Sequence, residues 1–165
     1  MTPPFHDEFV LVFDQHFARL FRYLDRLSGD VELAADLAQE TFIKLHQRGS
    51  LPAAPEAWLI TVAMNLFRNV QATRARRRRL LPVSRAGVVT SDPPALPDHM
   101  AEANETRARV RCAIDRLPER DRALLLLIAE GYSYHHIACA LDINEASVGT
   151  LLARAKRAFR AAYQG

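Results

Sequence analysis

The amino-acid sequence predicts an all-α protein with two small helical domains joined by an extended linker. Apolar residues recur at helical spacing in both halves of the chain, whereas no stretch alternates convincingly as a half-buried strand would. Prolines interrupt the helical pattern between the two halves. We therefore expect a first domain at residues 1–80, a flexible linker at 81–100 and a second domain at 101–165. The 165 residues, 49% of them hydrophobic, suffice for small globular cores.

The first domain is expected to begin with two helices. The first runs from about Asp7 to Leu27, and Asp30 can cap the second by accepting from an early backbone N–H. The second helix has a buried stripe and an outward stripe that is polar except for one isoleucine. The outward residues are Asp36, Gln39, Glu40, Ile43 and Gln47. Single exposed apolar residues are common, but acids around an apolar anchor also suit a docking surface for a basic partner, so both interpretations stay open.

A third helix dominates the first domain. It follows a loop at His46–Ala54, starts at Pro55 and ends in a run of arginines. Its two opposite apolar faces indicate that its first half is wedged between two neighbours. Between these faces lies a polar strip, and the arginines come after it: Thr61, Asn65, Arg68 and Asn69, then Arg76, Arg77, Arg78 and Arg79. No acid lies between Glu56 and Asp92, which favours contact with a polyanion over a merely solvated helix end.

The second domain is expected to hold four helices after the proline-rich linker. Residues that cap or break helices mark their ends: Pro118, Gly131, Ser133 and Asn144. The last two helices are Tyr134–Leu141 and Glu145 to about Tyr163, with Asp142-Ile143-Asn144 between them. Two short helices across a three-residue turn, the second one basic at its end, predict a helix-turn-helix.

Several kinds of function are disfavoured. Cys112 and Cys139 lack a metal-type spacing and are expected to be small buried thiols. The adjacent His135 and His136 point to different sides of a helix and cannot share a metal as an i, i+4 pair can. There is no glycine-rich phosphate loop, nucleophile elbow or plausible carboxylate pair. We predict no enzymatic activity, no cofactor and no metal, and a cytoplasmic protein without membrane insertion, because neither a signal peptide nor a long apolar run is present.

The order of these parts resembles the extracytoplasmic-function (ECF) class of bacterial sigma-70 family RNA polymerase sigma factors. Three stretches carry the resemblance, which extends from about Phe9 to Tyr163. Asp36–Leu45 is similar to the family's region 2.2, Ala57–Asn69 to its regions 2.3 and 2.4, and Leu117–Leu127 with Tyr132–Ala138 to its region 4. The class lacks the middle sigma domain, and the expected linker leaves no room for one.

The resemblance implies a function and its partners. The chain would bind core RNA polymerase, at the largest-subunit clamp helices and the flap, direct it to promoter DNA and help to melt the minus-ten element. It also implies an anti-sigma factor as a possible partner. Asp36, Gln39, Glu40 and Ile43 would meet the clamp helices, which favours the docking interpretation of this stripe. Asn65 and Asn69 would contact the non-template strand of the minus-ten element, although these asparagines could instead cap neighbouring loops.

The helix-turn-helix would bind the minus-thirty-five element. The residues expected to contact it are Ser147, Thr150, Arg154, Lys156 and Arg157. The recognition helix offers few side chains for contacts with bases, since Ala146, Gly149 and Ala153 also face outward and basic residues are missing from its start. The loop His46–Ala54 is shorter than in typical members. Asp142 stands where a helix-turn-helix commonly has glycine.

A helix-turn-helix regulator that acts without polymerase is the alternative. It explains the second domain equally well but not the polar strip and arginine run of the first. A palindromic binding site and stable duplex binding without polymerase would favour it.

Overall fold

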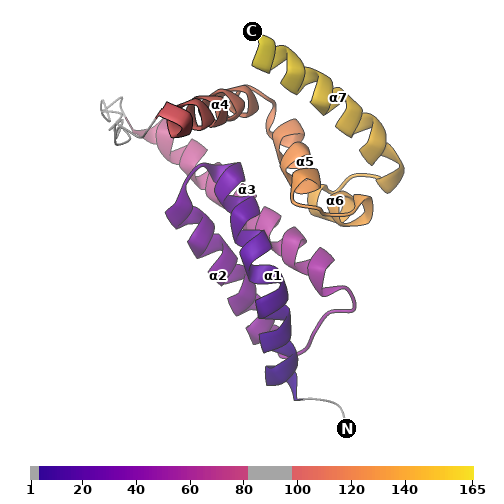
Figure 1. Ribbon diagram of the computed structural model, residues 1–165. Coiled ribbons are helices and arrows are strands. Elements are labelled where there is room, and N and C mark those ends of the chain that lie inside the picture. Colours follow the sequence, from indigo (N-terminus) through magenta and orange to yellow (C-terminus); the bar gives the residue numbers. More distant parts are fainter. Residues whose placement is uncertain (1–3, 82–97) are drawn as a thin grey trace.

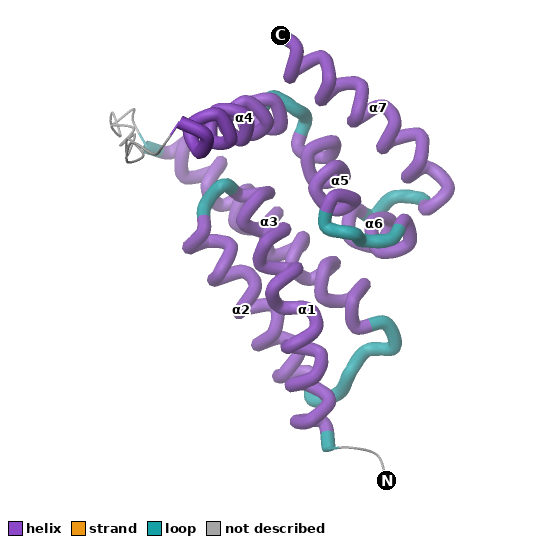
Figure 2. The backbone as a smooth tube through the Cα atoms, in the orientation of Figure 1, coloured by secondary structure: helices purple, strands orange, loops and turns teal. Residues whose placement is uncertain are grey.

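The computed structural model describes residues 4–81 and 98–165, and within them it contains helices and no strand (Figure 1). The helices are α1 (Phe5–Ser28), α2 (Val31–Arg48), α3 (Pro55–Leu80), α4 (Asp98–Asp115), α5 (Glu119–Ala129), α6 (Tyr134–Leu141) and α7 (Glu145–Gln164). Short loops join helices that follow one another in each half of the chain (Figure 2). The all-α prediction is therefore confirmed. The prolines expected in the linker, Pro82 to Pro97, lie outside the described residues.

Most helix ends fall where the sequence places them. Asp30 caps α2 as expected, because its Oδ1 accepts a hydrogen bond of 3.1 Å from the Leu33 backbone N–H. Two ends differ. α2 continues through Arg48 and stops at Gly49, whose φ of 73° is left-handed, so the expected loop at His46–Ala54 begins three residues later. α4 begins at Asp98, inside the range expected for the linker.

Helices α1, α2 and α3 form one bundle, with α3 between two sets of neighbours. One side of α3 packs on α2 and, more lightly, on α1, and the other packs on α6. Ile60, Met64 and Phe67 are therefore almost completely buried. The two apolar faces of α3 predict this wedged position. The identity of the second neighbour, a helix of the other half of the chain, is new information from the structure.

Helices α4–α7 form the second half, in which α5 and α7 share a core. Ser133 and Asn144 cap α6 and α7, accepting from backbone N–H groups at 3.1 Å and 3.0 Å. Asp142, between these helices, has a φ of 52° and is the single non-glycine residue with positive φ in the described part of the chain. The aspartate thus takes the left-handed turn that glycine commonly takes in a helix-turn-helix.

The two halves pack against each other, and their buried side chains form one continuous core. α1 meets α5, and α3 meets α6 (Figure 1). At one edge Gly29 ends α1 with a φ of 68°, and its missing Cβ leaves room for the Arg111 guanidinium of α4, which donates to the Arg26 carbonyl oxygen.

The prediction that both cysteines are buried is wrong. Cys112 and Cys139 are both exposed and unbridged. Their sequence neighbours are buried instead, Ala113 on α4 and Ala138 and Ala140 on α6. A small apolar residue in a helical pattern is compatible with either side, so spacing alone could not place these thiols.

Candidate polymerase and nucleic-acid interfaces

The outward face of α2 is exposed, and the helix packs through its other side on α1 and α3. Asp36, Gln39 and Glu40 are exposed, and the Ile43 side chain is 48% exposed. Glu40 lies 3.9 Å from Lys44 one turn later. The structure thus brings together all four residues that the sequence assigns to polymerase docking, in an acidic surface with one apolar residue.

An aromatic groove of about 460 Å³ lies beside Ile43, between α1 and α2. Phe13 and Phe42 line it, with ring centroids 5.0 Å apart in an edge-to-face arrangement. Phe9, Gln39, His46 and Gln47 complete the lining. The sequence alone did not reveal this groove. The i, i+4 repeat of Phe9, Phe13 and Phe17 was the available signal, because three rings on one stripe exceed what a two-helix contact covers.

The polar strip of α3 is divided between solvent and the second half of the chain. Asn65 and Asn69 are exposed. The Thr61 hydroxyl donates to the Ala57 carbonyl oxygen at 2.7 Å, and its side chain lines a groove that also holds Cys139 of α6. The strip is therefore not a single open surface.

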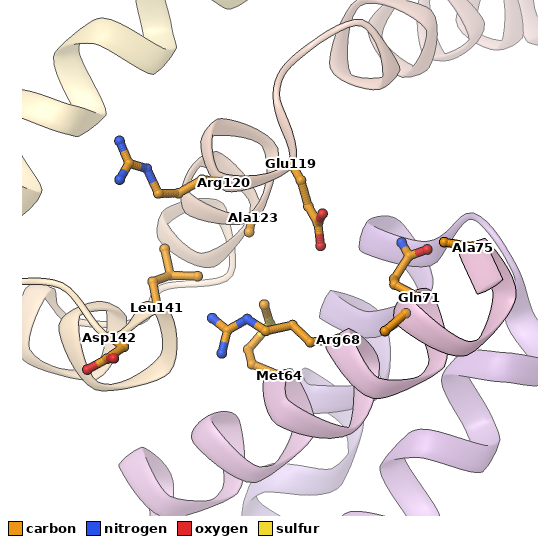
Figure 3. Close-up of a pocket in the computed structure, with 10 residues that line it drawn as sticks. Met64, Arg68, Gln71, Ala75, Glu119, Arg120, Ala123, Leu141 and Asp142 are labelled. Atoms are coloured by element: carbon orange, nitrogen blue, oxygen red, sulfur yellow. The ribbon is translucent and has the colours of Figure 1, made fainter.

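Arg68 is bound to the second half of the chain. Its Nη2 donates to the Ala140 carbonyl oxygen of α6 at 2.9 Å, and its Nη1 donates to Asn65 Oδ1 at 3.2 Å. Its side chain crosses a cleft of about 770 Å³ between α3 and the ends of α5 and α6, which Met64 and Asp142 also line (Figure 3). In this arrangement two of the guanidinium N–H groups are already bonded within the protein.

The arginine run extends past the bundle at the end of α3. Arg76, Arg77, Arg78 and Arg79 are all exposed. Arg74, one turn earlier, lies 3.6 Å from Asp30. Among the described residues, no acid lies within salt-bridge distance of the four arginines of the run itself. A set of arginines that follows the turns of a helix can meet phosphates from several directions.

The second basic surface lies on α7. Ser147, Thr150, Arg154, Lys156 and Arg157 are exposed, as the helix-turn-helix requires. Arg154 also lies 3.8 Å from Asp121, whose side chain is 8% exposed, which holds this arginine against the domain. A groove of about 400 Å³ continues the surface, and Tyr134, Gly149 and Arg160 line it with Lys156 and Arg157. Tyr134 and Arg160 were not among the residues that the sequence assigned to this surface.

Four titratable side chains lie at the junction of the two halves. Burial, and then the neighbouring Tyr132, raise the pKa of Tyr23, and burial raises the pKa of Tyr132 against the effect of Arg19. Burial, then Arg19, lower the pKa of His16. Burial, then His135 and Arg19, lower the pKa of His136. All four groups are thus held neutral near pH 7. No three His, Cys, Asp or Glu side chains gather as a metal site would in the residues described here.

Comparison with known proteins decides the family. Residues 12–79 match the model "Sigma-70 region 2", and residues 107–159 match "Sigma-70, region 4". The chain is 33% identical over 168 residues to the ECF RNA polymerase sigma factor SigL of Mycobacterium tuberculosis, covering 93% of this chain and 87% of SigL. The chain belongs to the ECF sigma factors.

Two further comparisons place this ECF sigma factor among its relatives. It is 33% identical over 161 residues to SigE of Mycolicibacterium smegmatis, and it spans 61% of that protein's length. Its fold matches the sigma factor RpoE of Bartonella quintana, solved in complex with the anti-sigma factor NepR. The TM-score is 0.66, with 20% identity over 97% of this chain and 96% of RpoE.

The family gives the two halves their names and the chain its activity. The region 2 match at residues 12–79 falls within α1–α3, and the region 4 match at residues 107–159 falls within α4–α7, so we call these two halves region 2 and region 4. The ECF sigma factors are transcription factors that direct RNA polymerase, and they act as regulators rather than enzymes. None of the described helices combines the length and apolar character needed to cross a bilayer.

Proposed function

We propose that this ECF sigma factor binds core RNA polymerase through α2, reads the minus-ten element with α3 and helps to melt it, and binds the minus-thirty-five element with α7. In this proposal region 2 occupies residues 1–80, the linker 81–100 and region 4 101–165. The observation that carries the proposal is the separation of three surfaces of different chemistry. An acidic, apolar surface lies on α2, and two basic or amide-rich surfaces lie on α3 and α7.

The α2 surface suits the clamp helices of the polymerase's largest subunit. Asp36 and Glu40 would meet basic groups of the partner, Gln39 would supply hydrogen bonds, and Ile43 would enter an apolar site. The groove lined by Phe13 and Phe42 adjoins Ile43 and could receive an apolar side chain of the partner. Region 4 would meet the polymerase flap.

The surfaces on α3 and α7 suit two forms of DNA. Asn65 and Asn69 are exposed on a rigid helix, so their amides can both donate to and accept from an unstacked base. The residues assigned to the minus-ten element are these two with Thr61, Arg68 and the arginines Arg76–Arg79. The basic face of α7 would contact the phosphates of duplex DNA. Ser147 and Thr150, near the N-terminus of α7, would lie closest to the base edges.

Three narrower statements belong to the same proposal. The protein works in the cytoplasm, where bacterial RNA polymerase is found. It has no catalytic activity, cofactor or resident metal of its own. An anti-sigma factor is included among its partners because RpoE, which shares the fold, was solved with one.

Run-off transcription with purified core polymerase and a promoter library tests the proposal. The parent protein should direct transcription from a defined subset of promoters. The double variant Asp36→Arg/Glu40→Arg should lose core binding in a pull-down by about tenfold or more, because two attractive contacts become repulsive. Its helical content should stay that of the parent.

The matched control makes the same charge change on another exposed surface. Asp7→Arg/Asp14→Arg alters two exposed acids of α1 that lie away from the aromatic groove, and this variant should bind core polymerase as the parent does. Equal binding by the two double variants would remove α2 from the proposed docking surface.

A further inference from the structure

A chain of contacts joins a cysteine, a histidine and a glutamate at the helix-turn-helix, and none of the three is assigned to DNA or polymerase. Cys139 and His135 lie four positions apart on α6, so they share one face of that helix. The Cys139 Sγ lies 3.9 Å from His135 Nε2. The other ring nitrogen, Nδ1, lies 3.3 Å from Glu145 Oε2 at the start of α7. We call these three side chains the thiol triad.

The order of the contacts in the thiol triad fixes where the imidazole carries its proton. A carboxylate can only accept a hydrogen bond, so His135 Nδ1 is the nitrogen that donates to Glu145. In a neutral imidazole the other nitrogen is then an acceptor, and this is the nitrogen that faces the Cys139 sulfur. His135 is therefore oriented to take the thiol proton. The Glu145 carboxylate lies where it would stabilise the resulting imidazolium.

The thiol triad can be reached from solvent, which a reactive thiol requires in addition to a base. Cys139 is exposed and unbridged, and the side chains of His135 and Glu145 are 60% and 58% exposed. Cys112, the other cysteine of the chain, is exposed as well. No histidine lies within four positions of Cys112 along α4, so Cys112 serves as an internal reference for a thiol without such a base.

The Cys139 side chain also lines a groove of about 510 Å³ between α6 and the start of α3. Pro52, Trp58 and Val62 supply apolar walls, and Thr61 supplies a hydroxyl. This hydroxyl donates to the Ala57 carbonyl oxygen at 2.7 Å, so its lone pairs remain able to accept from a bound molecule. An apolar groove with a few polar atoms suits a small molecule that has an organic body and one polar, reactive group.

From these observations we propose that Cys139 is an oxidation site for apolar organic hydroperoxides, with His135 as the base and Glu145 as the residue that positions it. The organic group of the peroxide occupies the groove. The sulfur attacks the terminal peroxide oxygen, so an S–O bond forms as the O–O bond breaks. The thiol proton passes to His135 Nε2 and from there to the leaving alkoxide, which departs as an alcohol. The sulfur is oxidised to a sulfenic acid by the two electrons that reduce the peroxide.

The product of this reaction is reversible and has a built-in reporter. A sulfenic acid is returned to the thiol by reaction with other thiols. Trp58 is the one tryptophan of the chain and lines the same groove as Cys139. Oxidation adds a polar oxygen to this groove, so Trp58 fluorescence should change on oxidation and recover on reduction. The site is independent of the contacts proposed for polymerase and DNA.

Trapping of the sulfenic acid tests the inference in the full chain. The reduced protein is treated with cumene hydroperoxide at pH 7 in the presence of dimedone, and peptide mass spectrometry gives a labelling rate for each cysteine. Cys139 should be labelled about threefold to thirtyfold faster than Cys112, because a thiol without a base is only a few per cent thiolate near this pH. In urea the two rates should become equal. With hydrogen peroxide, which has no organic group for the groove, the ratio of the two rates should be smaller.

Two variants test the roles of the other members of the thiol triad. His135→Gln should bring the Cys139 rate to within about twofold of the Cys112 rate, whereas His6→Gln, at an exposed position of α1, should leave it unchanged. Glu145→Ala should slow Cys139 in the parent but have no further effect in His135→Gln, because the glutamate acts through the imidazole. Slowing of the same size in both backgrounds would mean that Glu145→Ala only loosens α7.

Three results would overturn the inference. Equal labelling of Cys139 and Cys112 in the folded parent would remove the reactive thiol. An unchanged ratio of the two rates in His135→Gln would remove the base. The same ratio with cumene hydroperoxide and hydrogen peroxide would remove the groove as the binding site for the organic group. None of these measurements involves polymerase or promoter DNA, so their outcome is separate from that of the transcription assay.

Discussion

Helices α3 and α7 are the two elements assigned to DNA, and the structure treats them differently. The assigned residues of α7 are all exposed, whereas on α3 Arg68 is bonded to region 4 and Thr61 is half-buried beside it. α7 forms the outer layer of region 4, so one face of it stays open in any arrangement of the regions. α3 lies between two layers, so its availability depends on where region 4 sits. The contrast shows that a surface can be correctly assigned from residue types and still be conditional on a distant element.

The largest expected effect concerns whether the two regions unfold together. Leu127 of region 4 is completely buried in the continuous core, so Leu127→Ala should lower the free energy of unfolding by about 2–5 kcal/mol. Trp58, the one tryptophan of the chain, lies in region 2 and lines the groove with Cys139. If the regions form one cooperative unit, Trp58 fluorescence and far-ultraviolet circular dichroism should give one shifted transition. A Trp58 transition that stays at the parent's midpoint would show that region 2 unfolds independently.

The next effect separates the two DNA-facing helices by the element that each reads. Asn65→Ala or Asn69→Ala should remove about 1–3 kcal/mol of discrimination at a minus-ten base, because a hydrogen-bonding amide is lost. Permanganate footprinting of the holoenzyme and the ranking of minus-ten sequences measure this. Thr150→Ala on α7 is the control and should leave that ranking unchanged. If both asparagine variants melt the promoter and rank minus-ten sequences as the parent does, the two asparagines have a structural role. The minus-ten bases would then be read by the loop before α3.

A smaller effect is expected from the arginines that extend beyond both regions. Replacing any one of Arg76–Arg79 by alanine should weaken DNA binding equally for all sequences, because a phosphate contact carries no base information. The slope of log K against log salt should fall by about 1 unit or less per arginine. A salt titration of holoenzyme binding measures it. A variant whose loss depends on promoter sequence would show that the arginine reads a base.

The smallest effect is a pH dependence at the junction of the regions. His16 and His136 have pKa values lowered by burial, and the groups facing them are Arg19, His135 and Glu56, the last at 3.5 Å from His136. A histidine whose folded pKa is lowered takes up a proton less readily in the folded state than in the unfolded state. Its stabilising contribution is therefore present above pH 6.5 and is lost as the pH falls below that value.

The free energy of unfolding measured with urea should accordingly fall as the pH is lowered from 7.5 to 5. In the double variant His16→Gln/His136→Gln this pH dependence should be weaker. His6→Gln, at an exposed position of α1, is the control and should keep the parent's dependence. A free energy that rises as the pH falls would mean that the Glu56 carboxylate outweighs burial at His136.

The sequence by itself determined the features that local chemistry encodes. Caps at Asp30, Ser133 and Asn144 act within one helical turn, and each is confirmed by a side-chain oxygen on a backbone N–H. The outward stripe of α2 and the helix-turn-helix are likewise readable from periodicity, because a helix repeats every 3.6 residues whatever surrounds it.

Only the tertiary structure decided which surfaces meet. The apolar faces of α3 required a second neighbour, but no pattern specified α6, and the hydrogen bond from Arg68 to Ala140 spans 72 positions. The same holds for Glu130, whose burial depends on two arginines of α1, and for Cys139, whose position in a groove depends on α3. Helical spacing records that a side is apolar or polar. It does not record the partner, because packing between distant elements is selected by shape and charge summed over the whole interface.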